Sequence, residues 1–345
     1  MNSSKVKDIL LFILKLGIAG AIVWYLLLRE PEQLLASLRN FDIRYLVAAA
    51  LCYGCHIVIC SWRWRELATM LGIRLGRMES FTLTMQGIFF SLVIPGGAIG
   101  GDVVKMAVIS KRSSEGSRIE GAFTVLMDRI IGMIALFLLV LVIIFPAYGL
   151  LMNCTIPQFR LSDGIKQLGI LAVVLLSLAG IGASCLFFMH RIIHKVKFFD
   201  TVIKFFDRLT HGMISRMEQA ADVYSKRPAK LAVLVLVSVF GVHLLTVTPV
   251  LLLLSGIGVE YSVFTVVTAV TLGNVAGLIP IFPAGLGGRD LVTVTILAAG
   301  GVAVADAKSA QLLCTALIIL FNVSGGLFFV FDPGRKKSVS IQESI

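Results

Sequence analysis

Long apolar runs constrain this chain more than any other feature of its sequence. A helix of about 20 apolar residues crosses the hydrocarbon core of a bilayer. Six segments come close to or exceed that length: Ile9–Leu28, Tyr45–Trp62, Gly121–Leu151, Leu168–Met189, Leu231–Leu254 and Leu312–Phe331. Only 15% of the 345 residues are charged, against about 25% in an average soluble domain. We therefore predict an all-α polytopic membrane protein with six spanning helices.

Two further apolar segments, residues 80–110 and 261–302, are interrupted near their middles. Proline removes a helix hydrogen-bond donor, and glycine frees the backbone. We therefore expect each segment to form two half-helices joined at a hinge. The hinge residues are Pro95, Gly96, Gly97, Gly100 and Gly101 in the first segment, and Pro283, Gly285, Gly287 and Gly288 in the second.

Basic residues predict how these segments cross the membrane. They gather in residues 63–77, starting with Arg63, and in residues 105–118, 191–230 and 335–337. The positive-inside rule places these regions and both termini in the cytoplasm. The net charge of +11 then belongs mainly to the inner face of the plasma membrane. This assignment holds only if each interrupted segment is a re-entrant hairpin, the first entering from the cytoplasm and the second from outside.

The order of two spans, one hairpin and one span occurs twice along the chain. We therefore predict two halves, residues 1–151 and 152–331, followed by a basic cytoplasmic tail, residues 332–345. Because each half has an odd number of spans, the second half is expected to be inverted relative to the first. Residues 190–230, within the second half, show helical spacing of apolar and basic side chains. They predict an amphipathic segment along the cytoplasmic headgroups.

Matching motifs support an inverted repeat. The stretches Pro95–Asp102 and Pro283–Asp290 share a proline, two glycines and the final aspartate at an offset of 188 residues. Two more polar pairs lie at nearly the same offset, namely His56 with His243 and Gln86 with Asn274.

Three cations are expected near the middle of the membrane. Arg129 lies well inside a predicted span, and Lys105 and Arg289 follow the two hinges. The half-helices that begin after Gly101 and Gly288 would add the positive ends of two helix dipoles. This arrangement would suit the phosphate of a lipid headgroup.

The acidic residues allow three interpretations. Asp102 and Asp290 follow the glycines, so they could cap the half-helices or take part in coupling and protonation. Alternatively, Arg129 pairs with one of them in a buried ionic latch, because its sequence neighbour Asp128 does not face it on a helix. An anionic headgroup could open such a latch by competing for the arginine.

The symmetric histidines could either pack through hydrogen bonds or relay protons. We find no nucleophile with its base, no nucleotide-binding loop and no metal motif. We therefore expect no enzymatic activity, and no cofactor, metal or nucleic-acid partner. The predicted substrate-binding residues are Arg129, Arg289, Lys105, Asp102, Asp290, Asp128, Gln86, Asn274, His56 and His243.

Three motifs resemble the transmembrane region of lysylphosphatidylglycerol synthase, a flippase-like family. They are Pro95 to Lys105, Val125 to Arg129 and Pro283 to Asp290. The resemblance covers nearly the whole chain and implies movement of anionic, aminoacylated or isoprenoid lipids between leaflets. It also implies a lipid synthase or glycosyltransferase as a partner. Because no aminoacyl-transfer domain is seen, we do not expect a synthase.

Two alternatives to a lipid flippase stay open at this point. The hairpins suit a secondary transporter of a small soluble anion equally well. The chain could also be a non-transporting membrane subunit that recruits a lipid enzyme through residues 191–230.

Overall fold

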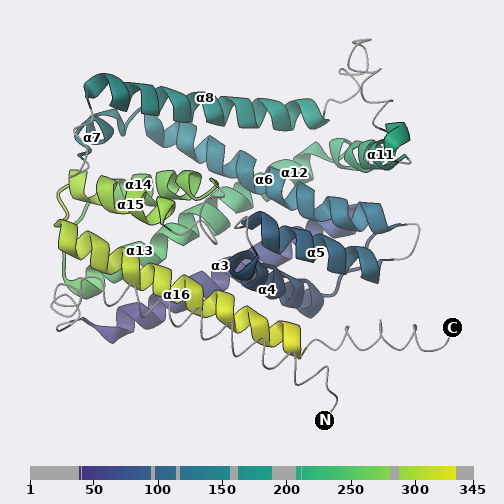
Figure 1. Ribbon diagram of the computed structural model, residues 1–345, viewed down its shortest axis with the longest axis horizontal. Coiled ribbons are helices and arrows are strands. Elements are labelled where there is room, and N and C mark those ends of the chain that lie inside the picture. The colour runs from purple at the N-terminus through teal and green to yellow at the C-terminus, as the bar shows by residue number, and fades with distance from the viewer. Residues whose placement is uncertain are drawn as a thin grey trace.

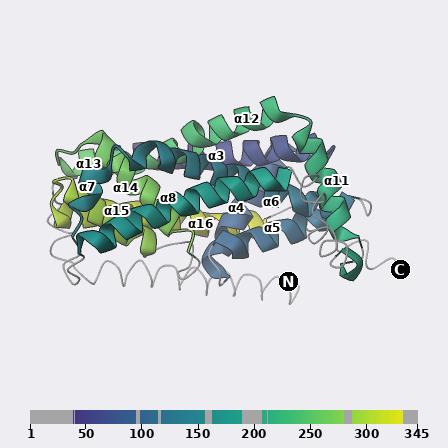
Figure 2. The same cartoon turned by 90° about the horizontal axis from the view of Figure 1, so that it is seen from above.

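The computed structural model describes residues 39, 41–94, 98–113, 117–155, 162–188, 207–210, 212–279 and 287–331. Every element assigned in these ranges is a helix. The helices are α3 (Ile43–Met70), α4 (Arg77–Val93), α5 (Ala98–Arg112), α6 (Arg118–Ile144), α7 (Tyr148–Met152), α8 (Asp163–Phe188), α11 (Met213–Ser225), α12 (Pro228–Val237), the π-helix η2 (Ser238–Leu244), α13 (Leu245–Ile257), α14 (Val263–Ala276), α15 (Gly288–Ala299) and α16 (Val304–Val330). The longest of them run along the long axis of the molecule (Figures 1 and 2).

Five helical stretches of the described chain are long and apolar enough to cross a membrane. They are α3, α6, α8, the continuous stretch from α12 to α13, and α16. Each overlaps one of the six predicted spans, although α3 continues eight residues past Trp62 and α16 begins eight residues before Leu312. The other predicted span, Ile9–Leu28, and the tail 332–345 lie outside the described residues.

One predicted span is shorter than expected. The segment Gly121–Leu151 was predicted to be continuous, but α6 ends at Ile144 and the separate helix α7 follows. Pro146 lies in the turn between them. Proline lacks the backbone N–H that a helix interior requires, which explains the end of α6.

Each interrupted segment contains two helices that pack against each other, α4 with α5 and α14 with α15. The first hinge is shorter than predicted, because α5 begins at Ala98 and includes Gly100 and Gly101. These glycines serve packing: a Cβ atom on Gly101 would collide with the carbonyl oxygen of Gly87 on α4. The predicted hinge residues Pro95, Gly96, Gly97, Pro283 and Gly285 lie outside the described residues.

The second hinge ends at two glycines that the structure describes. Gly287 precedes α15 with a φ of +92°, in the left-handed region that favours glycine. Gly288 is the first residue of α15.

Three apolar cores hold the described part of the bundle together, and one of them joins α3, α4, α5 and α6 through side chains that include Trp64, Leu83 and Ile109. The largest one joins α6, α13, α14, α15 and α16 through side chains such as Val140, Leu253 and Leu297. Another joins α3, α6 and α11 through Leu67, Phe123 and Tyr224. Helix α8 lies along α6 at the edge of the bundle (Figure 1).

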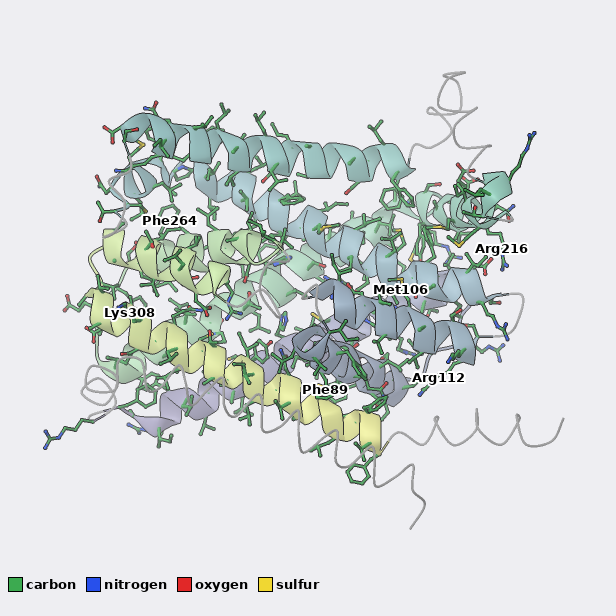
Figure 3. The ribbon with its side chains drawn as sticks, in the orientation of Figure 1. Phe89, Met106, Arg112, Arg216, Phe264 and Lys308 are labelled. Atoms are coloured by element: carbon green, nitrogen blue, oxygen red, sulfur yellow. The ribbon has the colours of Figure 1, made fainter. Side chains whose placement is uncertain are left out.

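Helix α11 forms most of the described part of the predicted amphipathic segment, of which residues 190–206 and 211 lie outside the described residues. It is attached to α6, since Arg216 forms a 2.6 Å ion pair with Glu120. Arg216 lies at the same end of the molecule as Arg112, whereas Lys308 lies at the opposite end (Figure 3). The end of the predicted segment belongs to α12, which begins at Pro228.

Candidate functional site

A cavity of about 650 Å³ lies in the middle of the bundle. The α4/α5 pair and the α14/α15 pair both border it, because Asp102 of α5 and Arg289 of α15 line the cavity. These two residues are 187 residues apart in sequence. Arg129 of α6 also lines the cavity, eleven residues after the start of that helix at Arg118. At 1.5 Å per residue, this places Arg129 about 16 Å along the helix. The cavity is therefore far from either end of a spanning helix.

Seven of the ten predicted substrate-binding residues line this cavity. They are His56, Asp102, Asp128, Arg129, His243, Asn274 and Arg289. The folded chain thus collects, from six helices, polar residues that are widely spaced in sequence.

The other three predicted residues lie outside the lining. Gln86 donates a 3.1 Å hydrogen bond to the carbonyl oxygen of Phe328 and joins α4 to α16. The Lys105 ammonium lies 3.7 Å from the ring centroid of Trp64, a cation–π contact that turns it towards α3. Asp290 lies next to Arg289 and orients it.

Arg63 and Asp128 form the most enclosed ion pair of the cavity wall. Arg63 Nε lies 2.9 Å from Asp128 Oδ1, and the two side chains are only 6% and 11% exposed. Arg63 Nη1 also donates a 2.9 Å hydrogen bond to Ser238 Oγ on η2. The prediction that Arg63 belongs to a cytoplasmic basic cluster is therefore wrong. Its charge is stabilised inside the bundle because Asp128 and Ser238 replace water.

Arg129 and Asp102 form a second ion pair with a different environment. Arg129 Nη2 donates a 2.7 Å hydrogen bond to Asp102 Oδ1, and Arg129 Nε donates to Asp102 Oδ2. Asp102 is one of the two partners that the latch hypothesis offered. Because it is the fifth residue of α5, the capping alternative is wrong for Asp102. The Arg129 side chain is 49% exposed, so its guanidinium is accessible from the cavity.

Arg289 lies in a third group of charged and polar side chains. It pairs with its neighbour Asp290 at 2.9 Å and donates to Thr315 Oγ1 at 2.9 Å. Asp290 also accepts a 2.8 Å hydrogen bond from Gln311 and one from the backbone N–H of Gly287. Asp290 therefore caps the start of α15 as well as pairing with Arg289.

The two histidines of the cavity have different partners. His243 Nε2 lies 2.9 Å from the carbonyl oxygen of Gly132 on α6. His243 belongs to the π-helix η2, a rare geometry that often occurs at functional sites. His56 Nε2 lies 3.7 Å from Cys60 Sγ, and the His56 ring stacks on Tyr53.

Two buried polar atoms of cavity residues have no hydrogen-bond partner within the described part of the chain. They are His56 Nδ1 and Gln311 Oε1. The amide nitrogen of Gln311 is already bound to Asp290, which fixes the amide oxygen as a free acceptor. Unsatisfied buried polar atoms are costly, so these two are suited to bind a polar ligand.

Part of the cavity lining is apolar and accessible. Ile99, Leu126 and Leu278 line the cavity and are 59%, 36% and 43% exposed. The cavity therefore combines a polar interior with an accessible apolar edge.

Sequence reasoning missed Arg63, Gln311 and Thr315. The sequence does contain a pattern that could have placed Arg63 in the site. Tyr53, His56, Cys60 and Arg63 follow one another at intervals of three or four residues. Such spacing places side chains on one face of a helix. All four line the cavity.

These features define the class of protein: a polytopic α-helical membrane protein with a charged cavity at mid-bundle. The lysylphosphatidylglycerol synthase TM region matches residues 12–326, and the chain belongs to this family. It is 26% identical over 320 residues to a UPF0104 membrane protein of Pyrococcus horikoshii, covering 89% of this chain and 91% of the relative. It is 24% identical over 293 residues to a UPF0104 membrane protein of Methanothermobacter thermautotrophicus, with coverages of 82% and 83%.

Proposed function

We propose that this protein moves an anionic, phosphate-bearing lipid between the two leaflets of the plasma membrane. The main support comes from Arg129. This residue lies near the middle of a spanning helix, and its half-exposed guanidinium faces the cavity. An isolated charge at that depth is costly. A single carboxylate, that of Asp102, offsets it here.

In this mechanism the lipid phosphate competes with Asp102 for Arg129. Both are anionic acceptors that can take two hydrogen bonds from one guanidinium. Exchange of one for the other keeps the Arg129 guanidinium paired throughout. Arg289 extends the cationic surface on the opposite helix pair. Gln311 Oε1 would accept a hydrogen bond from the headgroup, and His56 Nδ1 would donate or accept one according to its tautomer.

The apolar edge of the cavity favours a lipid over a small soluble anion. A lipid needs a lateral path along which its headgroup enters while its acyl chains stay in the bilayer. Exposed Ile99, Leu126 and Leu278 provide an apolar surface at the cavity lining. A soluble anion would have no use for such a surface.

Two inverted halves, with hairpins entering from opposite sides, fit this mechanism. In the proposed orientation, the end that carries Arg112 and Arg216 faces the cytoplasm (Figure 3). The two hairpins would then approach the cavity from opposite leaflets. Rearrangement of one hairpin against the other would expose Arg129 and Arg289 to the two sides in turn.

Lipid movement in reconstituted vesicles tests the proposal. Vesicles carry a headgroup-labelled fluorescent phosphatidylglycerol, and dithionite destroys the label in the outer leaflet. We expect the wild-type protein to make the inner-leaflet label accessible, and Arg129→Gln to lose most of this activity. Arg44→Gln is the matched control, because Arg44 is an exposed arginine paired with Asp42 outside the cavity.

Three results would contradict the proposal. The first is label loss no faster than in protein-free vesicles. The second is equal activity of Arg129→Gln and wild type. The third is Arg129-dependent uptake of inorganic phosphate without lipid movement, which would establish the small-anion alternative instead.

A further inference from the structure

A second hollow, of about 690 Å³, lies on the outside of the bundle between α3 and α4. We call it the α3/α4 groove, and its lining includes Val58, Trp62 and Arg65 of α3 with Arg77 and Phe81 of α4. A short connection between Met70 and Arg77 joins the two helices, which are antiparallel. Across the groove, Ser61 Oγ and Ser80 Oγ lie 3.0 Å apart and join the two helices.

The groove changes from charged to apolar along its length. Arg65 and Arg77 lie at the end next to the connection. Trp62, Phe81 and Val58 follow in the direction away from it, and Trp62 is 40% exposed. At 1.5 Å per residue, Val58 lies about 10 Å from Arg65 along α3. A charged end followed by an apolar surface with an exposed tryptophan is the pattern of a membrane interface.

The charged end of the groove has a positive excess. Glu66 also lines the groove, but its carboxylate pairs with Lys230 at 2.8 Å. Arg65 donates through Nε to the carbonyl oxygen of Leu75 at 3.0 Å, which holds its guanidinium at the groove. The other carboxylate oxygen of Glu66 lies 3.8 Å from Arg65 Nη1, too far for a hydrogen bond. Within the described part of the chain, neither terminal nitrogen of Arg65 donates a hydrogen bond, and the Arg77 side chain has no ion-pair partner. Both arginines can therefore bind an anion.

We infer that the α3/α4 groove binds one anionic phospholipid. Its phosphate lies between Arg65 and Arg77, and an acyl chain follows the apolar side chains towards Val58. Charge complementarity determines the class of ligand, since arginines at an interface attract anionic lipid headgroups. The apolar part of the groove excludes a free inorganic anion as its main occupant, because such an anion cannot cover that surface.

This site is separate from the central cavity. Successive residues on a helix point about 100° apart, so Arg63 faces the cavity whereas Trp62 and Arg65 face the groove. None of the residues that line the groove also lines the cavity. The inference therefore does not depend on the proposed transport function.

Quenching of Trp62 fluorescence by brominated lipids tests the site. The protein is reconstituted into phosphatidylcholine vesicles that contain brominated phosphatidylglycerol or, in parallel, brominated phosphatidylcholine at the same mole fraction. Subtracting the signal of Trp62→Phe removes the contributions of Trp24 and Trp64. We expect Trp62 to show a preference of about tenfold for the anionic lipid, which decreases at high salt.

Two arginine variants make the test specific. Arg65→Gln/Arg77→Gln is expected to abolish the preference. Arg74→Gln, an exposed position in the same connection outside the groove lining, is expected to keep it. Equal quenching of wild-type Trp62 by the two lipids would overturn the inference and leave the groove as ordinary lipid-facing surface. A preference that survives in the double variant would overturn it as well.

Discussion

Arg63 of α3 and Asp128 of α6 form an ion pair in the wall of the central cavity, 65 residues apart in sequence. Two further hydrogen bonds hold the arginine in place: Arg63 Nη2 donates to the backbone carbonyl of Asp128, and Arg63 Nη1 donates to Ser238 Oγ. One guanidinium thus connects α3, α6 and η2. The Arg63–Asp128 pair differs in this respect from the Arg129–Asp102 pair, in which the arginine is accessible from the cavity.

Arg63→Met is expected to destabilise the protein strongly, because it leaves the Asp128 carboxylate buried without its counter-charge. Loss of one partner of a buried pair costs about 3–5 kcal/mol. The unfolding of detergent-solubilised protein, followed by circular dichroism, measures the change. Arg63→Met/Asp128→Leu, which removes both charges, should recover most of the loss. If the double variant is as unstable as the single one, the ion pair is not the cause.

Arg129→Gln is expected to separate transport from stability. Its side chain is half exposed to the cavity, whereas both partners of the Arg63–Asp128 pair are enclosed. The variant should therefore lose less stability than Arg63→Met, but it should lose lipid movement in the vesicle assay. Asp102→Asn should behave differently, because it frees Arg129 to hold the lipid and slows its release. A large fall in stability for Arg129→Gln would instead indicate a structural latch.

Gly101→Ala is expected to force α4 and α5 apart. The added Cβ would collide with the Gly87 carbonyl oxygen and lie 3.1 Å from Ser91 Cβ. Overpacking of this kind costs about 1–3 kcal/mol. Gly182→Ala in α8 is the matched control, since its Cβ meets no atom within 4 Å, and alanine favours a helix by up to about 1 kcal/mol. Thermal unfolding midpoints should move in opposite directions, and equal shifts would contradict this explanation.

The stability of the first turn of α3 is expected to depend on pH through Asp42, the N-cap residue of this helix. Hydrogen bonds from the Arg44 side chain and backbone N–H lower the pKa of the Asp42 carboxyl. Because the pKa is lower in the folded state, the stabilisation is complete above the ordinary carboxyl pKa of about 4. It disappears as the pH falls through the folded-state value.

The comparison of wild type with Asp42→Ala measures this effect. Hydrogen exchange at the first turn of α3 should be slower in wild type at pH 6, and the difference should vanish in acid. Asp42→Asn keeps an acceptor oxygen but has no charge to titrate. It should therefore show no such pH dependence, and a persistent dependence would assign the titration to another group.

The sequence predicted the helices well because apolar length and chain breaks are local properties. A run of about 20 apolar residues must satisfy its backbone within one helix, which explains why α3, α8 and α16 overlap their predicted spans. Pro146 ended α6 early, although the apolar run continues past it. Gly101 was misassigned as a hinge, because glycine serves close packing as readily as a break.

The sequence by itself determined an all-helical membrane protein with two interrupted segments and a set of intramembrane charges. The tertiary structure alone decided which charges meet. Arg63 pairs with Asp128, and Lys105 turns to Trp64 instead of the cavity. The reason is physical: a partner across the bundle depends on the rotation and tilt of two helices. Those are fixed by the packing of many side chains together, and no local pattern records them.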